Sequence, residues 1–253
     1  MQKNNLVGIA ALFIVLAGVI LYAATKPAPA KAPGTAAPIA LSGTSYAEHA
    51  QYYDIAANYA SSTPLAEPAN TAAVTMMKNF VGSTVAQFLA DGKFDRLTPE
   101  DVTMMGFDKG RKEKLQILYM IASSPNTVTY IFTTYMDTLG AHGNTFFNTF
   151  TFNTDSGKPV ALADLFLPGS DYLGTLSSIS RAKLPGVIGK DYDMTFIQDG
   201  TTPEDKNFSA FFPDNKNLDI LFPPYQVAPY SDGPQTLQIP RSELSSILKP
   251  EYR

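Results

Sequence analysis

Hydrophobic residues recur along this chain with two periods, and each period predicts a type of element. Between residues 72 and 89 the apolar positions follow helical spacing, so we expect an amphipathic helix that ends at 91–92 and lies on a sheet. Apolar and polar residues alternate at 115–121 and again at 127–136, around the turn-forming residues 123–126. These two runs predict a β-hairpin.

Shorter patterns predict the other elements. A strand is expected at 46–60, and a strand at 145–152 extends the hairpin into a meander of antiparallel strands. Further along we expect a short helix at 162–166, a helix capped by Asp171 and terminated by Pro185, an irregular acidic loop at 186–206, strands at 218–222 and 236–239, and a last helix at 242–248. Because strands and helices mix without βαβ regularity, the pattern predicts an α+β fold in which helices pack on antiparallel sheets.

The N-terminal part carries a membrane signal. Residues 6–24 are nineteen consecutive uncharged residues, which at about 1.5 Å per residue span roughly the hydrocarbon core of a bilayer. A cleaved signal peptide is the alternative, but its apolar core is usually about 7 to 15 residues long, and residues 23–25 make a poor cleavage site. We therefore expect an uncleaved transmembrane signal anchor at 6–24, preceded by a short cytoplasmic end at 1–5.

The residues after the anchor predict where the folded part lies. Residues 25–40 are rich in Ala and Pro and predict an extended tether, while the chain from 41 onward has enough large apolar side chains for a core. The chain has no cysteine, so neither a disulfide nor a lipoprotein anchor contributes. Since an N-terminal anchor normally exports the residues on its C-terminal side, we expect a single-pass protein of the cell membrane whose bulk is extracytoplasmic.

Composition disfavours several function classes. The net charge is −4 and no basic cluster occurs, which disfavours nucleic-acid binding. Two histidines and no cysteine leave little for a zinc site, and the acids at 191–205 lack EF-hand spacing, so we expect no metal and no cofactor. Phosphate-binding, dinucleotide-binding and nucleophile motifs are absent from the sequence, so we expect no enzymatic activity, although a paired-carboxylate glycosidase site leaves no linear motif.

Two phrases carry the strongest functional pattern. The first runs from 140 to 152, Gly-Ala-His-Gly-Asn-Thr-Phe-Phe-Asn-Thr-Phe-Thr-Phe, and the second from 222 to 234, Phe-Pro-Pro-Tyr-Gln-Val-Ala-Pro-Tyr-Ser-Asp-Gly-Pro. Prolines and tyrosines in a loop make a stiff contact for a ligand, but a rigid turn that packs on its own domain would use the same residues. His142 could likewise face a partner or fix its own loop through a backbone hydrogen bond.

Together with residues 157–166, the two phrases resemble the extracytoplasmic domain of RsiV-type anti-sigma factors, the lysozyme-sensing membrane proteins of bacteria. Upstream, the order of elements is similar to the module that precedes that domain and that also occurs beside cell-wall polysaccharide deacetylases. The resemblance implies two modules, at 41–139 and 140–253, in a protein that binds lysozyme or a related cell-wall ligand as a sensor, inhibitor or decoy. It also implies the residues that make the contact: Thr138, Gly140, Ala141, His142, Pro223, Tyr225, Pro229 and Tyr230.

The N-terminus departs from this family. An RsiV-type factor carries a sigma-binding segment before its membrane span, and residues 1–5 are too short to hold it, so sigma regulation is not expected. Two alternatives of other classes stay open. One is a peptidoglycan-binding module whose aromatic residues stack on glycan, and the other is a cell-wall hydrolase that depends on buried acids.

Overall fold

A computed structural model of the chain describes residues 38–253. The predicted signal anchor at 6–24 and nearly all of the predicted tether lie outside these residues. Within the described part, no helix combines the length and the apolar character that a bilayer span requires.

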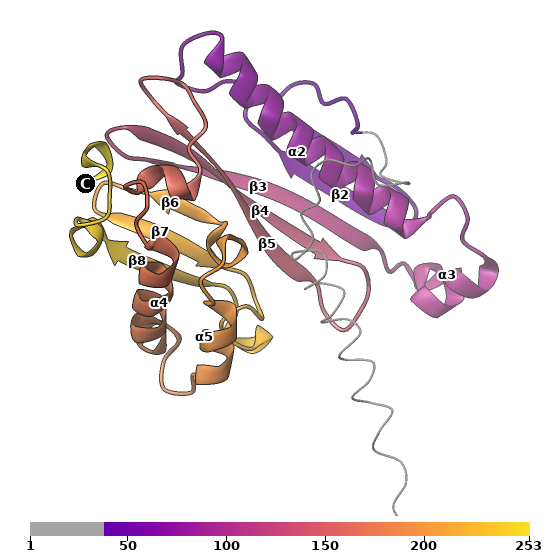
Figure 1. Cartoon of the computed structure of the whole chain (residues 1–253). Helices are drawn as coiled ribbons and strands as arrows, with labels where there is room; N and C mark the ends of the chain where they lie inside the picture. The colour runs from indigo at the N-terminus through magenta and orange to yellow at the C-terminus, as the bar shows by residue number, and fades with distance from the viewer. Residues whose placement is uncertain (1–37) are drawn as a thin grey trace, which may run out of the picture. The chain divides into compact units, whose positions relative to one another are not determined.

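The described residues form two sheets with helices packed on them, so the predicted α+β class is confirmed (Figure 1). A five-stranded sheet has the order β1-β2-β3-β4-β5, and a three-stranded sheet has the order β6-β7-β8. The strands are β1 (Ser45–His49), β2 (Tyr53–Asn58), β3 (Glu113–Ser123), β4 (Thr127–Asp137), β5 (Asn144–Asn153), β6 (Phe211–Pro213), β7 (Asn217–Phe222) and β8 (Gln235–Pro240). The α-helices are α2 (Ala69–Gly92), α3 (Pro99–Met105), α4 (Tyr172–Ile188) and α5 (Met194–Gly200).

The pairing of the five-stranded sheet confirms one prediction and corrects two. β3, β4 and β5 form the predicted hairpin and antiparallel meander. β2, however, runs parallel to β3, because the connection between them contains α2 and α3 and is long enough for a crossover. The single strand predicted at 46–60 is instead the antiparallel pair β1 and β2, joined by a short turn at 50–52.

The helix α2 lies across one face of the five-stranded sheet and builds the first hydrophobic core (Figure 1). It confirms the helix predicted from the spacing of apolar residues. Met77, Val81 and Val85 are fully buried in its stripe, and Leu115 and Ile117 of β3 point toward them from the sheet. Burial in the first core accounts for Met77, so this methionine does not need to be explained by metal or ligand binding.

The strand β4 is buried on both faces, whereas β3 is covered on only one. Ile131 of β4 faces away from α2 and is 2% exposed, because β6 crosses this side of the sheet. The amide of Phe211 in β6 donates a hydrogen bond to Thr149 Oγ1 of β5 at 3.3 Å. On the same side of β3, Leu118 and Met120 remain exposed. The C-terminal part of the chain that shares the second core, from Val160 onward and called the C-terminal module below, therefore covers part of this face and leaves the rest open.

The C-terminal module has its own core, in which α4 packs on the three-stranded sheet. Asp171 caps α4 as predicted, since its carboxylate accepts a hydrogen bond from the amide of Gly174 at 3.0 Å. The predicted end of the helix at Pro185 is wrong, because α4 continues to Ile188. A proline lacks one amide donor, but so near the helix end only one bond is lost, and the amide of Gly189 closes the last turn on the Pro185 carbonyl.

Other local predictions for this module need correction. The loop predicted at 186–206 contains α5, which begins because the carboxylate of Asp193 accepts a hydrogen bond from the amide of Thr195 at 2.7 Å. The short helix predicted at 162–166 is a 3₁₀ turn, Leu162–Leu165. The last helix, predicted at 242–248, is reduced to the 3₁₀ turn Arg241–Leu244, and a further 3₁₀ turn, Pro250–Tyr252, follows beyond the predicted range. The first core extends through β5 to Phe152, and the second begins at Val160.

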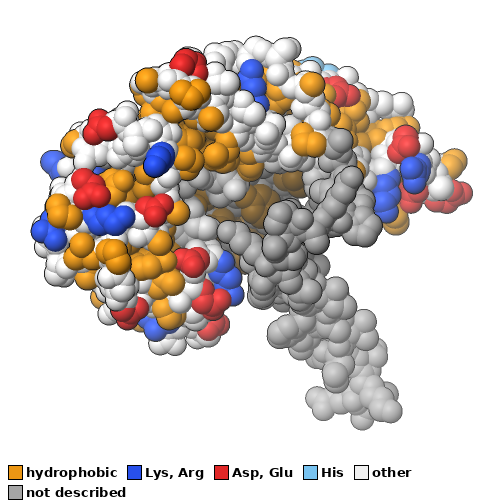
Figure 2. Space-filling model, turned by 45° about the horizontal axis from the view of Figure 1, so that its top comes forward, with side chains coloured by type: hydrophobic (Ala, Val, Ile, Leu, Met, Phe, Trp, Pro, Cys, Tyr) orange, Lys and Arg blue, Asp and Glu red, His pale blue; other side chains and the backbone are white. Residues whose placement is uncertain are grey.

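The helix α3 and the turn after it form a polar end of the molecule. Thr98 and Asp101 make a capping box at its start, in which each side chain binds the other's backbone amide. Figure 2 shows acidic and basic side chains gathered at this end. This end therefore adds charge rather than hydrophobic core.

A buried carboxyl group in β7 makes stability depend on pH. Asp219 is 1% exposed, and neither of its oxygens has a hydrogen-bond partner of good geometry. Desolvation raises its pKa to about 6, although Gln238 on the neighbouring strand offsets part of the effect. A raised pKa means that the folded state holds the proton more tightly, so folding is favoured at low pH and this stability is lost as pH rises from about 4 to about 6.

We therefore predict that Asp219→Asn stabilises the protein above pH 6 by up to about 3 kcal/mol relative to the wild type, with the difference vanishing toward pH 4. Urea unfolding of both proteins at several pH values measures this. Parallel pH profiles for the two proteins would show that Asp219 does not titrate in this range.

Candidate binding site

The two phrases singled out in the sequence meet in space. The first supplies the loop between β4 and β5, and the second supplies the loop between β7 and β8. His142 Nε2 lies 2.8 Å from the hydroxyl of Tyr225, which is 83 residues away in the sequence. The His142 ring also stacks on Tyr230, with ring centroids 3.7 Å apart and planes inclined by 19°. We call His142, Tyr225 and Tyr230 the aromatic cluster.

Hydrogen bonds fix the tautomer and position of His142. Its Nδ1 lies 2.9 Å from the carbonyl oxygen of Gly143, and a carbonyl only accepts, so Nδ1 carries the proton. In the neutral ring Nε2 is then an acceptor, and the Tyr225 hydroxyl donates to it. The hydroxyl of Tyr230 donates to the same Gly143 oxygen at 2.8 Å. His142 thus fixes its own loop through the backbone and at the same time ties it to the second loop.

Gly143 packs closely against a side chain of the sheet, which a larger residue would displace. A Cβ atom at this position would lie 2.2 Å from the hydroxyl oxygen of Tyr135, a residue of β4 beneath the loop. Desolvation, with smaller contributions from Asp137 and Tyr230, raises the pKa of Tyr135. Tyr135 therefore stays neutral and supports the aromatic cluster from below.

Both loops hold a residue in the left-handed backbone region that favours glycine. Leu139 has φ of 61° and Tyr225 has φ of 71°. The amide of Gln226 donates to the carbonyl of Pro223 at 3.2 Å, so residues 223–226 form a tight turn in which Tyr225 occupies the third position. A side chain in this conformation costs about 1–2 kcal/mol. Such outliers concentrate at functional sites, which makes Tyr225 a candidate contact residue.

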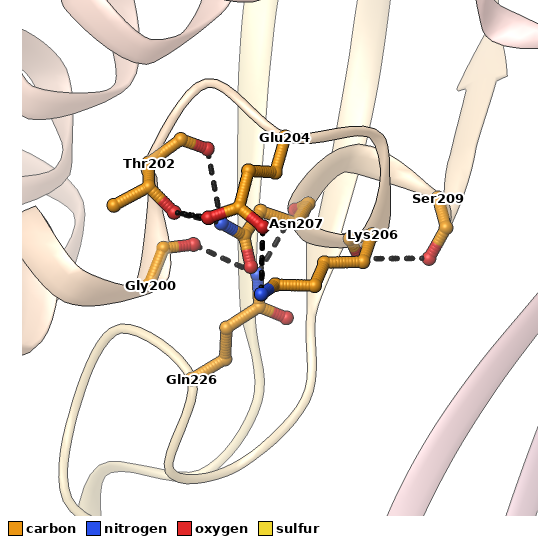
Figure 3. A network of polar contacts seen from close by, with 7 residues as sticks. All are labelled: Gly200, Thr202, Glu204, Lys206, Asn207, Ser209 and Gln226. Carbon is orange, nitrogen blue, oxygen red and sulfur yellow. Dashed lines mark hydrogen bonds and ion pairs between the residues drawn. The ribbon is translucent and has the colours of Figure 1, made fainter. Parts of the chain in front are cut away.

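The base of the second loop is anchored by Gln226. Its side-chain amide donates to the carbonyl oxygens of Gly200 and Asn207, both at 2.9 Å (Figure 3). A Cβ atom at Gly200 would lie 1.8 Å from the Gln226 backbone oxygen, so only glycine allows this approach. Asn207 is held in turn by Thr202, to which its amide donates at 2.6 Å. The strained turn is therefore mounted on a fixed support.

The predicted contact residues differ in exposure. Tyr225 is 43% exposed, and the other exposed members are Thr138, Gly140, Ala141 and His142. The half-buried members are Pro223, Pro229 and Tyr230. The site also depends on Tyr135, Gly143 and Gln226, which the sequence did not lead us to expect as site residues. Gly143 was the one local signal for them, since a glycine in a loop can mark a close approach of another residue, here Tyr135. The contact of all eight residues with a ligand stays a prediction.

An open recess of about 500 Å³ lies beside the first loop, between Leu139 and the charged residues Asp54, Arg111, Lys112, Lys114 and Asp137. Lys112 Nζ lies 3.1 Å from Asp54, and hydrogen bonding from His49 and then Lys112 lowers the pKa of that carboxyl. An ionised, paired carboxylate is a poor proton donor. Among residues 38–253 no group of three or more potential metal ligands occurs.

Comparison with known proteins places part of the chain in a family. Over 196 residues the chain is 30% identical to the peptidoglycan-N-acetylmuramic acid deacetylase PdaC of Bacillus subtilis; the match covers 77% of this chain but only 40% of that protein. A crystal structure of a DUF3298 family member from Bacteroides fragilis superposes with a TM-score of 0.58 at 14% identity, over 85% of this chain and 95% of that one, which shows a shared fold. Residues 163–242 match the family described as "Protein of unknown function (DUF3298)" and thus carry a DUF3298 domain.

Proposed function

We propose that this chain is a membrane-anchored, extracytoplasmic binding protein of the cell envelope that captures a macromolecule, with lysozyme as the first candidate, through the aromatic cluster. The observation that carries the proposal is the convergence of two distant loops on His142. The resemblance to lysozyme-sensing proteins, which the same two phrases carry, supports lysozyme as the ligand. The printed name of the PdaC relative supports a cell-wall setting.

The chemistry of the site favours recognition over catalysis. The hydrogen bonds of His142 join it to a backbone carbonyl and to the Tyr225 hydroxyl, and no carboxylate of residues 38–253 is bonded to it, so the site lacks the acid that orients a catalytic histidine in a hydrolase triad. A cell-wall hydrolase would need two carboxyl groups facing each other. The buried acids of the described part, Glu113 and Asp219, lie in different sheets. These two acids therefore do not face each other; the carboxylate near Glu113 is Asp137 and the one near Asp219 is Asp214.

The charge distribution suits a cationic partner such as lysozyme. All 23 acidic residues but only 16 of the 19 Lys and Arg residues lie in the part from Pro38 onward, which gives it a net charge of −7. Neither loop of the site carries a Lys or Arg, because the sequence has none from 115 to 157 or from 217 to 240. The same two loops carry only one acidic residue, Asp232, so the negative charge that would attract a basic protein lies on the rest of the part from Pro38 onward and acts at long range.

The proposal also includes an N-terminal anchor in the membrane. Residues 6–24 would hold the protein in the membrane, and the Ala/Pro-rich residues 25–40 would set the folded part away from the lipid surface. A peptidoglycan-binding module is the second candidate, supported by the exposed ring of Tyr225, which could stack on a sugar. Under that alternative the protein binds purified peptidoglycan and not lysozyme.

We expect the full chain, kept in mild detergent, to bind lysozyme in a calorimetric titration, and Tyr225→Ala combined with Tyr230→Ala to weaken binding by more than about tenfold, or about 1.4 kcal/mol. The reason is that both rings sit where a partner would desolvate them. Tyr192→Ala is the matched control, because Tyr192 is 42% exposed and lies between α4 and α5, away from the cluster. Equal affinities for all three proteins would remove the cluster from the binding site.

Replacing Tyr225 by glycine separates binding from folding. Tyr225→Gly removes the ring and also the strain at φ of 71°, so we expect weaker binding together with a melting temperature that is unchanged or higher. Thermal unfolding and the same titration measure both effects. A melting temperature lowered by several degrees would indicate that the ring serves the fold rather than a ligand.

A further inference from the structure

The charged recess beside the first loop is built by three neighbouring strands. Asp54 of β2 pairs with Lys114 of β3, and Lys114 pairs with Asp137 of β4, so these side chains form a row across one face of the sheet. Arg111 and Lys112 lie where the chain enters β3, and Leu139 lies where it leaves β4. The volume of about 500 Å³ is in the range of small-molecule sites.

Arg111 is held in place at both ends. Its backbone amide donates a hydrogen bond to the carbonyl of Gly106 at 3.2 Å. Its side-chain stem packs over Gly106, where a Cβ atom would lie 2.9 Å from the Arg111 Cδ. At the other end, Nη2 donates to the carbonyl of Leu139 at 3.5 Å. A guanidinium placed in this way loses little conformational entropy when a ligand binds.

The carboxylates of the recess leave Arg111 without an ionic partner. Asp54 is bonded to Lys112 at 3.1 Å and to His49 at 3.0 Å. Asp137 accepts a hydrogen bond from the amide of Leu139 at 2.9 Å. No ion pair within 4.0 Å involves Arg111 among residues 38–253. Most N–H donors of its guanidinium fork therefore remain available to a ligand.

The backbone at Leu139 is strained, with φ of 61°. In this conformation its carbonyl accepts from Arg111 while its amide donates to Asp137. The one residue therefore keeps the cation in the recess and engages the nearest acid. Backbone strain of this kind is concentrated at functional sites.

The charge of the recess suits a ligand group with one negative charge. Three basic and two acidic side chains line it, which gives a net charge of +1. The neighbouring Asp108 and Lys109 offset each other. Glu113 is buried on the opposite face of β3, where desolvation and then Asp137 raise its pKa. A carboxylate neutralises the recess, whereas a phosphate group with a charge of about −1.5 to −2 would leave excess negative charge beside Asp54 and Asp137.

We propose that the recess binds a single carboxylate group, which takes two parallel N–H donors from Arg111 while Lys114 adds positive charge. The ligand class is a sugar or a peptide that carries a carboxylate. Leu139 joins the recess to Thr138 and Gly140 of the first loop, so a ligand held here would also reach that loop. This site goes beyond the proposed function and does not depend on it, since a small acid binds with or without lysozyme.

The test uses two pairs of probes in which one member lacks the carboxylate. N-acetylmuramic acid is compared with N-acetylglucosamine, and N-acetylalanine with N-acetylalanine amide. Each is titrated against the full chain in nonionic detergent, with binding followed by ligand-observed NMR. We expect an acid to bind about tenfold or more tightly than its neutral counterpart, and Arg111→Gln to weaken binding of that acid by about tenfold or more.

Arg96 supplies the matched control. Its side chain is 80% exposed in the connection between α2 and α3, where it pairs with Asp95 at 3.4 Å. Arg96→Gln removes the same charge as Arg111→Gln, and we expect it to change binding by less than about twofold. Arg111→Lys keeps the charge but loses the planar fork, so we expect a several-fold loss. Thermal unfolding of each variant checks that the fold is intact.

The outcomes are separate from those of the lysozyme titration. Equal binding of the acid and neutral probes in both pairs, or equal effects of Arg111→Gln and Arg96→Gln, would overturn the carboxylate site. Inorganic phosphate that displaces the acid at equal concentration would show a general anion site and overturn the assignment to a carboxylate. A preference confined to one pair supports the site and identifies a sugar or a peptide as the source. Failure of lysozyme to bind would overturn the proposed function alone.

Discussion

The carbonyl oxygen of Gly143 is the acceptor on which the candidate site depends. It receives a hydrogen bond from His142 of its own loop and another from Tyr230 of the loop 87 residues away. Because the two donors also stack on each other, the position of each ring determines the position of the other. Tyr135 lies so close beneath Gly143 that any side chain at this position would displace the tyrosine ring. A chain without cysteine thereby fixes two distant loops with neutral hydrogen bonds and stacking alone.

The backbone strain at Tyr225 can persist because the surrounding loops are held rigidly. A left-handed tyrosine lowers stability unless surrounding contacts hold it, and here Gln226 supplies one hydrogen bond to Gly200 at the end of α5 and another to Asn207 in the turn that follows. Loops fixed before binding lose less conformational entropy when a partner arrives. Two features that each reduce stability, a strained turn and an exposed aromatic ring, therefore occur together where a recognition surface would use both.

Features of the fold that depend on residues close together in the sequence could be predicted from it, and features that depend on distant residues could not. The stripe of α2, the β3–β4 hairpin and the Asp171 cap depend on neighbours within a few residues, and all three were predicted. The parallel pairing of β2 with β3 depends on a crossover of more than fifty residues, which no local pattern encodes. The helix α5 was missed for a different reason, since its polar surroundings suggested a loop and only Asp193 signalled a helix start.

The contacts within the candidate site were harder to predict from the sequence than the fold. Each phrase was visible in the sequence, but Gln226 joins its loop to Gly200 and Asn207 through contacts that no spacing reveals. The exposed face of β3 is harder still to predict, because apolar residues occupy both faces of β3 as they do on β4. On β4 this pattern reflects cover from both sides, by α2 and by β6, whereas on β3 the second cover is missing at Leu118 and Met120. An apolar run thus predicts that a face will be covered, and only the structure shows that residues 38–253 leave β3 open at Leu118 and Met120.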